Sequence, residues 1–264
     1  MPKRKRPTTT TTDIQDHKQQ IVEGYDDYSF YAQEDYWEKR YHNDHEKSYE
    51  WWCGVDELLP LIELLVPCKT SSILDLGCGT SGLLVGMAEQ GDYDGHLTGI
   101  DFSKEAIRVS TTLAKAKDVN NVEFLCSNAT KLSFSNDSMD VVLEKGTISG
   151  IISSEVGESL LKNMMKEVHR VLKDDGLFLS IMCSDPNDDD DTTNGMNVLQ
   201  EMILPPLLES CKASGHYYTI NVHSSDTFRG CHCYALRKKK RAMTRSATKG
   251  GTITADISVR LHEH

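Results

Sequence analysis

An apolar segment that runs directly into a glycine-rich turn limits the possible folds of this chain more than any other feature. The segment is Ile73-Leu-Asp-Leu-Gly-Cys-Gly-Thr-Ser-Gly82, in which Gly77, Gly79 and Gly82 have the spacing G-x-G-x-x-G. Glycines are needed where a strand turns sharply into a helix and its backbone approaches a ligand closely. The pattern alone predicts a strand, a turn and a helix with a ligand at the turn, and it occurs in dinucleotide sites too.

Apolar segments with strand character alternate with amphipathic segments along the rest of the chain. This alternation predicts parallel βαβ units in a Rossmann-like, doubly wound α/β fold with a mainly parallel sheet. The last two apolar segments, Tyr217–Val222 and Cys231–Leu236, predict a C-terminal antiparallel strand pair, which NAD-type Rossmann domains lack. We expect strands near 72–76, 96–101, 121–126, 139–144 and 177–183, and helices near 55–65, 82–90, 103–117, 157–172 and 196–213.

Asp75 indicates which ligand the glycine turn binds, because it lies two residues before Gly77 at the expected end of the strand. A carboxylate at this point would repel a pyrophosphate. S-adenosylmethionine has no phosphate and carries a positive sulfonium and a free amino group, which a carboxylate attracts. We therefore predict S-adenosylmethionine as the cofactor and S-adenosylhomocysteine as the product, bound by Asp75, Gly77, Gly79 and Gly82. The alternative is a glycine turn with a chance aspartate.

Asp101 is the second candidate ligand of the cofactor. It ends the run His96-Leu-Thr-Gly-Ile-Asp101 and lies 24 residues after Gly77. An acidic residue about 20 residues past the glycine motif commonly binds the ribose hydroxyls, so Asp101 is predicted to accept hydrogen bonds from both. The alternative is a cap for the helix that begins at Ser103. Phe102 is expected to pack on the adenine face.

The motif Leu-Asp-Leu-Gly-Cys-Gly at residues 74–79 resembles the first motif of class I, seven-strand methyltransferases. In that class an acidic residue followed by a small one commonly holds the adenine amino group after the third strand. The corresponding positions here are Asn128 and Ala129. The amide oxygen of Asn128 accepts a hydrogen bond without a charge, so the resemblance implies a weaker adenine contact, with a simple turn as the alternative.

The flanking segments Tyr36-Trp-Glu-Lys-Arg-Tyr41, Tyr49-Glu-Trp-Trp52 and Glu144-Lys-Gly-Thr147 resemble one eukaryotic methyltransferase-like group. Its members include lysine methyltransferases that act on elongation factor 1-alpha and on citrate synthase. The resemblance covers roughly residues 36–237, although the group usually continues the last motif with Leu-Asp, where this chain has Ile148-Ser149. It implies an enzyme that transfers a methyl group to the side-chain amine of a lysine in a protein such as elongation factor 1-alpha.

Two further residues are predicted to take part in this reaction. Ligands of open α/β sheets bind at the carboxyl ends of the strands, and Glu144 ends the fourth expected strand. Glu144 is the predicted catalytic residue, placed to orient the incoming amine at the wall of the cofactor pocket; the alternative is a solvated charge. Trp37 is predicted to wall the cofactor pocket, with core packing as the alternative. No Asn-Pro-Pro-Tyr or Asp-Pro-Pro-Tyr motif follows this strand, which argues against nucleobase or glutamine methylation.

Length and composition predict one folded domain with tails. Residues 1–24 are charged, threonine-rich and poor in apolar residues, which predicts a disordered arm. Residues 25–240 are assigned to the methyltransferase domain and residues 241–264 to a flexible tail. The sequence contains neither the roughly 20 consecutive apolar residues of a membrane span nor an apolar signal segment, so we expect no membrane partner and a cytoplasmic location.

The charge balance predicts the kind of partner. A net charge of −11 argues against nucleic acid and favours a protein substrate with a basic surface. Asp185–Asp191 contains four consecutive aspartates, which either attract such a surface or form a solvated loop. The basic run Lys3–Arg6 is either a nuclear localisation signal, which adds the nucleus as a location, or a set of solubilising charges.

Several alternatives stay open at this point. A small-molecule methyltransferase would use the aromatic segment 25–41 as a lid over its substrate. A non-catalytic binding module would keep the cofactor fold as a scaffold. No metal site is predicted from the eight scattered cysteines, because Cys231 and Cys233, the only close pair, have the spacing of one strand face, with metal binding as the alternative.

Overall fold

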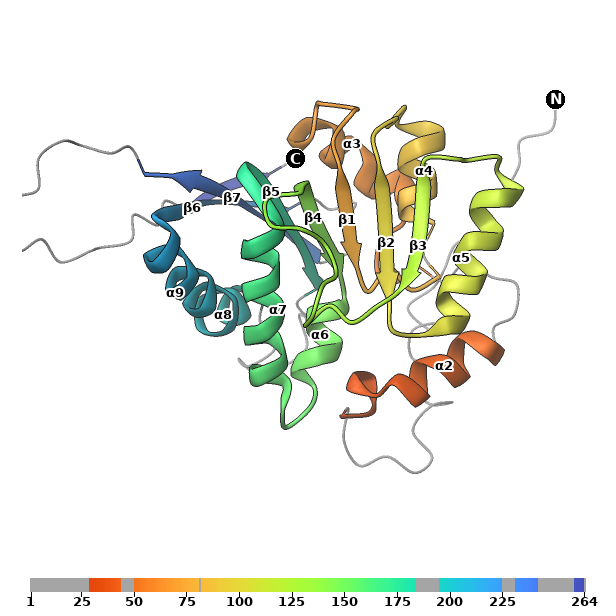
Figure 1. Ribbon diagram of the computed structural model, residues 1–264, viewed down its shortest axis with the longest axis horizontal. Helices are drawn as coiled ribbons and strands as arrows, with labels where there is room; N and C mark the ends of the chain where they lie inside the picture. The colour runs from red at the N-terminus through yellow and green to blue at the C-terminus, as the bar shows by residue number, and fades with distance from the viewer. Residues whose placement is uncertain are drawn as a thin grey trace, which may run out of the picture.

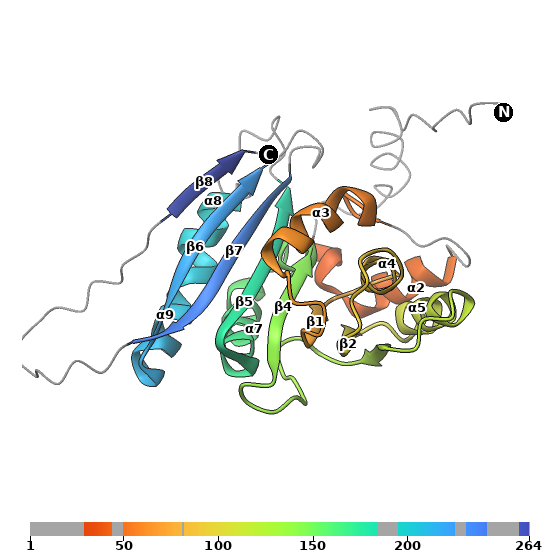
Figure 2. The ribbon, with the colours of Figure 1, turned by 90° about the horizontal axis from the view of Figure 1, so that it is seen from above.

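One mixed sheet with helices on both faces forms the body of the protein (Figures 1 and 2). The computed structural model describes residues 29–43, 50–80, 82–183, 195–224, 231–241 and 259–263. Within them eight strands form the sheet in the order β3-β2-β1-β4-β5-β7-β6-β8. The strands are β1 (Ile73–Leu76), β2 (Leu97–Asp101), β3 (Val122–Cys126), β4 (Met139–Lys145), β5 (Leu172–Cys183), β6 (His216–Ser224), β7 (Cys231–Lys240) and β8 (Val259–Glu263).

The helices lie close to the predicted positions, and three short or unpredicted elements join them. The helices expected near 55–65, 82–90, 103–117, 157–172 and 196–213 are all present. The short helix η1, α2 and α6 were not predicted from the sequence. The described helices are η1 (Ser29–Ala32), α2 (Glu34–Asn43), α3 (Val55–Leu65), α4 (Leu83–Gln90), α5 (Lys104–Ala116), α6 (Thr147–Ile152), α7 (Gly157–Val171), α8 (Gly195–Asn197), the π-helical η3 (Val198–Ile203) and α9 (Leu204–Ser214).

The sheet confirms the predicted Rossmann-like fold. Strands β3, β2, β1, β4 and β5 are parallel, whereas β7 runs antiparallel between β5 and β6. Strand β1 pairs with both β2 and β4, so that Asp75 lies opposite Gly99 and Leu76 lies opposite Glu144. This register brings the carboxyl ends of three strands to one edge, where ligands of open α/β sheets bind.

Two apolar cores form, one on each face of the sheet. One is built from α3, α4 and the apolar side of α5, and the other from α6, α7 and α9. Strand β4 supplies both, because Val141 and Leu143 belong to the first core and Val142 to the second. Each fully buried aliphatic side chain of this kind contributes about 1.5–3 kcal/mol. The cores fix the strands, and the strand ends in turn fix the ligand edge.

The basic run Arg237–Arg241 at the end of β7 holds this strand against the rest of the sheet. Lys238 is buried, and its ammonium donates to the carbonyls of Leu172 at 2.6 Å and His169 at 2.9 Å and to Asp137 at 3.1 Å. Its neighbours Lys239 and Lys240 pair with Asp175 and Asp174, near the start of β5. The run therefore stabilises the sheet.

The predicted flexible tail, residues 241–264, needs one correction. Val259–Glu263 forms β8, which pairs in parallel with β6 so that Val259 lies opposite Ile220. The outer edge of β6 offers unpaired backbone groups to an added strand, and a five-residue segment is too short for its alternation to be recognised in the sequence. The predicted arm 1–24 and the acidic loop 185–191 lie outside the described residues. In the described part, no helix is long and apolar enough to cross a membrane.

A buried histidine connects α7 with the closing strands. His169 Nε2 lies 2.8 Å from the hydroxyl of Ser214, which itself donates to the carbonyl of Ser210, so Nε2 carries the proton. Its Nδ1 then accepts from the Tyr218 hydroxyl at 3.1 Å. The neutral ring satisfies both partners. Burial first, and then the nearby Lys238, lower the pKa of His169 to about 4.

This histidine makes a testable contribution to stability. The pKa of an unfolded histidine is about 6.5, so below that pH the unfolded chain gains a proton that the folded protein refuses until about pH 4. The free energy of unfolding of the wild-type protein should therefore fall by about 2 kcal/mol between pH 7 and pH 4.5 because of His169. Urea unfolding at a series of pH values measures this loss. Between pH 7 and pH 4.5, the free energy of unfolding of His169→Gln should fall by about 2 kcal/mol less than that of wild type. His96→Gln changes an exposed histidine, so its free energy of unfolding should depend on pH as that of wild type does. If the free energies of unfolding of wild type and His169→Gln change with pH in parallel, His169 is not the buried neutral histidine that this prediction requires.

Candidate active site

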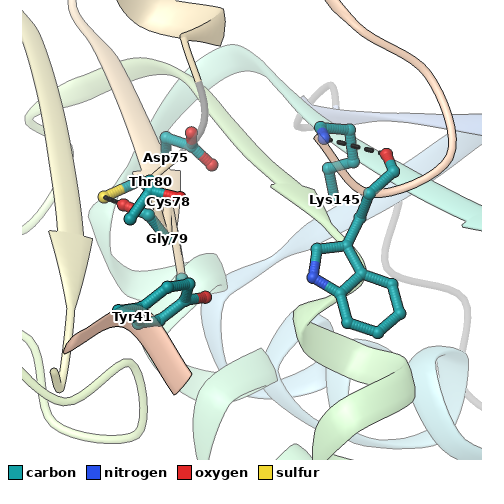
Figure 3. Close-up of a pocket in the computed structure, with 8 residues that line it drawn as sticks. Tyr41, Asp75, Cys78, Gly79, Thr80 and Lys145 are labelled. Atoms are coloured by element: carbon teal, nitrogen blue, oxygen red, sulfur yellow. Dashed lines mark hydrogen bonds between the residues drawn. The ribbon is translucent and has the colours of Figure 1, made fainter. Parts of the chain in front are cut away.

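A cavity opens at the carboxyl ends of β1 and β4, between the glycine turn and the segment before α3. Figure 3 shows Asp75 and the turn on one side of this space, with Lys145 on the other and Tyr41 below. Figure 1 shows α2, which carries Tyr41, at the edge where β1, β2 and β3 end. The residues that line the cavity are Tyr41, Trp51, Asp75, Gly77, Cys78, Gly79, Thr80 and Lys145.

The glycine turn requires glycine at two of its positions. Gly77 has φ of +69° and Gly79 has φ of +53°, in the left-handed region that side chains disfavour. A Cβ on Gly77 would lie 2.1 Å from Thr147 Oγ1, and one on Gly79 would lie 2.8 Å from the Tyr41 hydroxyl. Thr147 approaches so closely because its hydroxyl donates to the carbonyl of Leu76 at 2.7 Å. The turn is therefore held by the first residue of α6 from one side and by α2 from the other.

Asp101 fixes the same turn from the end of β2. Its carboxylate accepts hydrogen bonds from the N–H of Gly79 at 2.9 Å and from the N–H of Ser103 at 2.8 Å. The hydroxyl of Ser110 donates to the Gly79 carbonyl at 2.9 Å. Burial raises the pKa of Asp101 to about 6, and hydrogen bonds from the backbone N–H groups of Ser103, Gly79 and Phe102 oppose this shift. A carboxylate has about four acceptor positions, so the backbone does not use all of them and a ligand hydroxyl can still bind.

Asp75 places a buried carboxyl group at the cavity. Its side chain belongs to a residue only 4% exposed, and no described residue donates a hydrogen bond to it. Burial raises its pKa to about 8; Lys145 opposes this shift, and Glu144, Glu50 and Asp101 add to it. Burying a carboxylate without a partner is costly. The position suits a ligand that brings a positive charge into the cavity.

Glu50 and Lys145 connect the wall of the cavity to the start of α4. One oxygen of Glu50 accepts from the N–H of Gly82 at 2.8 Å and the other from Lys145 Nζ at 3.0 Å. Lys145 Nζ also donates to the carbonyl of Trp51 at 3.0 Å. Neither Glu50 nor Lys145 was singled out from the sequence, although both lie in the motifs Tyr49-Glu-Trp-Trp52 and Glu144-Lys-Gly-Thr147. The motifs marked these two segments in the sequence. The contact between Glu50 and Lys145, which are 95 positions apart, could be seen only in the fold.

The family of the chain follows from comparison with known proteins. Residues 68–251 match a family described as "Methyltransferase domain". The chain belongs to this methyltransferase family. It is 31% identical over 181 residues to an eEF1A lysine and N-terminal methyltransferase homolog of Drosophila melanogaster, which is 68% of this chain and 24% of that protein. It is 36% identical over 119 residues to a demethylmenaquinone methyltransferase of Listeria welshimeri, which is 45% of this chain and 48% of that protein.

Solved structures show the same fold at lower identity. A SAM-dependent methyltransferase from Aquifex aeolicus superposes with a TM-score of 0.51 at 17% identity, covering 75% of this chain and 97% of that one. The PH0226 protein from Pyrococcus horikoshii gives 0.50 at 23% identity, covering 71% and 89%. This chain spans about a quarter to a half of the length of the relatives compared by sequence.

The predicted cofactor is confirmed: this methyltransferase uses S-adenosylmethionine. The residues present fit it, because the unsatisfied Asp75 carboxylate suits a cationic ligand and Asp101 has acceptor positions left for hydroxyls. Gly77 and Gly79, which are predicted to let the backbone come close to the ligand, both line the cavity. Gly82 begins the first turn of α4 and gives its N–H to Glu50. The glycine turn and the two aspartates thus form one site.

Glu144 lies on the other face of β4 from the cavity, which corrects its predicted role. The side chain is fully buried, and its carboxylate accepts from the N–H of Ile148 at 3.1 Å and from the hydroxyl of Ser180. Burial raises its pKa to about 7, against these hydrogen bonds. Because side chains alternate along a strand, Lys145 faces the cavity and Glu144 does not. The structure assigns Glu144 to holding the start of α6 against β5.

Trp37 lies behind the cavity wall and not on its surface. Its indole N–H donates to the carbonyl of Tyr31 at 2.6 Å, and its ring stacks on Tyr41 with centroids 5.5 Å apart. It also meets Trp51 edge to face at 5.7 Å. Tyr41 and Trp51 line the cavity, so Trp37 positions two wall residues through ring contacts worth about 0.5–1.5 kcal/mol each.

The predicted adenine contacts lie at the neighbouring strand ends, outside the described cavity lining. Phe102 is half-buried after β2, next to Asp101, and its carbonyl accepts from Cys126 Sγ at 3.3 Å. Asn128 is exposed after β3, and its side-chain oxygen accepts from both the N–H and the hydroxyl of Thr130 at 2.8 Å. This is the turn role that the sequence left as the alternative. Ala129 packs against the apolar core.

The state of Asp75 gives a prediction for cofactor binding. With a pKa of about 8, the Asp75 carboxyl is mostly protonated at pH 7 in the free protein, and a bound ammonium lowers that pKa. Binding of S-adenosylhomocysteine at pH 7 should therefore release a proton, and affinity should rise between pH 6 and pH 8. Calorimetry in buffers of different ionisation enthalpy measures the release. Asp75→Asn should abolish it and weaken binding by about tenfold, whereas unchanged proton release in that variant would reject the assignment.

Proposed function

We propose that this methyltransferase modifies the side-chain amine of a lysine in a protein, of the kind represented by elongation factor 1-alpha. The observation that carries the proposal is the 31% identity to the Drosophila melanogaster homolog over 68% of this chain. The resemblance of the flanking motifs to those of protein-lysine methyltransferases also supports it. A net charge of −11 suits a substrate with a basic surface, and the proposal places the enzyme in the cytoplasm together with the translation factor.

Methyl transfer to a lysine requires an unprotonated amine that is aligned with the methyl group of the cofactor. When bound, S-adenosylmethionine supplies a methyl group on a positively charged sulfur, and its transfer leaves S-adenosylhomocysteine. A lysine ammonium has a reference pKa near 10.4, so the side chain must lose a proton to water before its nitrogen can form the new bond. Tyr41 and Trp51 give the cavity an aromatic wall that excludes water and lines up the reacting atoms. The carboxylates of Asp75 and Asp101 make the site attractive to a cationic side chain.

A small-molecule substrate is the second candidate. It is supported by the 36% identity to the Listeria welshimeri demethylmenaquinone methyltransferase over 119 residues. Aromatic residues of η1 and α2, together with Trp51, gather beside the cavity, with Tyr31 and Trp51 meeting edge to face at 5.9 Å. An aromatic cover of this kind also suits an apolar ring as the methyl acceptor.

Label transfer separates the two candidates. The protein is incubated with methyl-labelled S-adenosylmethionine and either purified elongation factor 1-alpha or the small-molecule fraction of a cell extract. We expect label on the elongation factor, at a lysine side chain identified by mass spectrometry. Asp101→Ala, which removes the predicted ribose contact and the Gly79 hydrogen bond, should lower the rate at least tenfold and serves as the control. Label in the small molecules alone would favour the second candidate, and label on an α-amino group would contradict lysine as the acceptor.

A further inference from the structure

Helix α2 crosses the ends of the central strands without being part of either apolar core. Figure 1 shows it at the edge where β2 and β3 end, next to the start of α5. None of its described side chains belongs to the two cores, and among them only Tyr41 is buried. Segments with few buried apolar contacts open at a lower free-energy cost than the core. Polar and ring contacts therefore keep α2 in place.

One side chain of α2, that of Glu38, forms hydrogen bonds to the start of α5. Glu38 Oε2 accepts from the Ser103 hydroxyl at 2.5 Å and from the N–H of Glu105 at 3.2 Å. Ser103 is the N-cap of α5, and its Oγ in turn accepts from the N–H of Ala106 at 3.1 Å. Hydrogen bonds to a charged acceptor are roughly twice as strong as neutral ones. Glu38 thus joins α2 to α5 through a charged contact.

Ser103 also connects this contact to Asp101, the predicted ribose ligand. The backbone N–H of Ser103 donates to Asp101 Oδ1 at 2.8 Å, while its hydroxyl donates to Glu38. Burial is the main cause of the raised pKa of Asp101, and the nearby Glu38 carboxylate adds to it. Like charges at this range repel each other. The repulsion works against the closed position of α2, and the two hydrogen bonds of Ser103 work for it.

Residues of α2 also cover Asp101. The Asp101 side chain is buried, and it is close enough to Tyr41 that its carboxylate adds to the effect of burial in raising the pKa of the Tyr41 hydroxyl. Tyr41 itself lies against the glycine turn, where a Cβ on Gly79 would be 2.8 Å from its hydroxyl. The backbone of Gly79 and Ser103 occupies further positions around the carboxylate. A ligand hydroxyl can therefore reach Asp101 most easily when α2 moves away.

We propose that Glu38 is a positioning residue that holds α2 closed over the cofactor site, and that the cofactor enters and leaves when the hydrogen bond between Glu38 and Ser103 breaks. Glu38 is not among the residues that line the cavity, so it acts through Ser103 and through the helix that carries Tyr41. It sets the rate at which the product S-adenosylhomocysteine is released. The inference concerns the cofactor alone and holds for either proposed methyl acceptor.

The rate constants of cofactor binding test the role of Glu38. The three tryptophans of the chain, Trp37, Trp51 and Trp52, lie in or next to the cavity wall, so their fluorescence reports binding. Stopped-flow mixing with S-adenosylhomocysteine measures the association and dissociation rate constants. In Glu38→Ala the dissociation rate constant should rise at least tenfold, while the association rate constant should stay the same or rise. Glu38→Gln keeps an acceptor for Ser103 without the charge, and its rate constants should stay within threefold of wild type.

Lys39→Ala is the matched control, because Lys39 is the exposed neighbour of Glu38 on the same helix. Its rate constants should equal those of wild type. A lower association rate constant in Glu38→Ala with an unchanged dissociation rate constant would mean that Glu38 only shapes the site, and would overturn the proposal. Unchanged rate constants in Glu38→Ala, or an equal rise in dissociation in Lys39→Ala, would overturn it as well.

A double-mutant cycle then tests whether Glu38 acts through Ser103. Ser103→Ala removes the hydroxyl that donates to Glu38, together with the N-cap of α5, so it should also raise the dissociation rate constant of S-adenosylhomocysteine. If the two side chains act through one hydrogen bond, adding Glu38→Ala to Ser103→Ala should raise that rate constant by less than a further threefold. Full multiplication of the two separate effects would show that Glu38 holds α2 by another contact and would refute the assignment.

Discussion

The hydrogen bond from the N–H of Gly79 to the Asp101 carboxylate is the contact on which the site depends. It joins the end of β2 to the turn after β1, while Ser110 of α5 holds the Gly79 carbonyl. Glycine adopts the left-handed region without a steric penalty but loses much conformational freedom on folding, so hydrogen bonds that fix Gly79 in this conformation matter. Here the carboxylate that is predicted to bind the ribose also shapes the turn beside it, so the prediction assigns ligand binding and turn geometry to one group.

Three buried carboxyl groups dominate the electrostatics of the site. Asp75, Asp101 and Glu144 are all buried near the strand ends, and burial raises the pKa of each carboxyl. Asp101 and Glu144 accept hydrogen bonds from backbone N–H groups, whereas Asp75 accepts none from the described residues. The unsatisfied member is thus the one that faces the cavity. A cationic cofactor offsets the free-energy cost of burying Asp75 without a hydrogen-bond donor. Cofactor binding should therefore raise the stability of the folded protein.

The sequence predicted the parts of the site that depend on local chain geometry. Gly77, Gly79, Asp75 and Asp101 lie at strand ends in a fixed spacing, so alternation of strands and helices was enough to bring them together. Glu144 was assigned to the cavity wrongly because its face depends on which residue of β4 pairs with β1, a one-residue matter of register. Glu50, Tyr41 and β8 were missed because their contacts are made with segments distant in the chain.

The motif Glu144-Lys-Gly-Thr147, which resembles that of the lysine methyltransferase group, acts mainly by holding the site together. Glu144 fixes α6, Thr147 fixes the carbonyl of Leu76, and Gly146 has φ of +86° beside the ring of Trp52. Ile148 is fully buried, so leucine and isoleucine at that position serve the same core. Only Lys145 turns to the cavity. The motif therefore acts on the geometry of the glycine turn and of the start of α6.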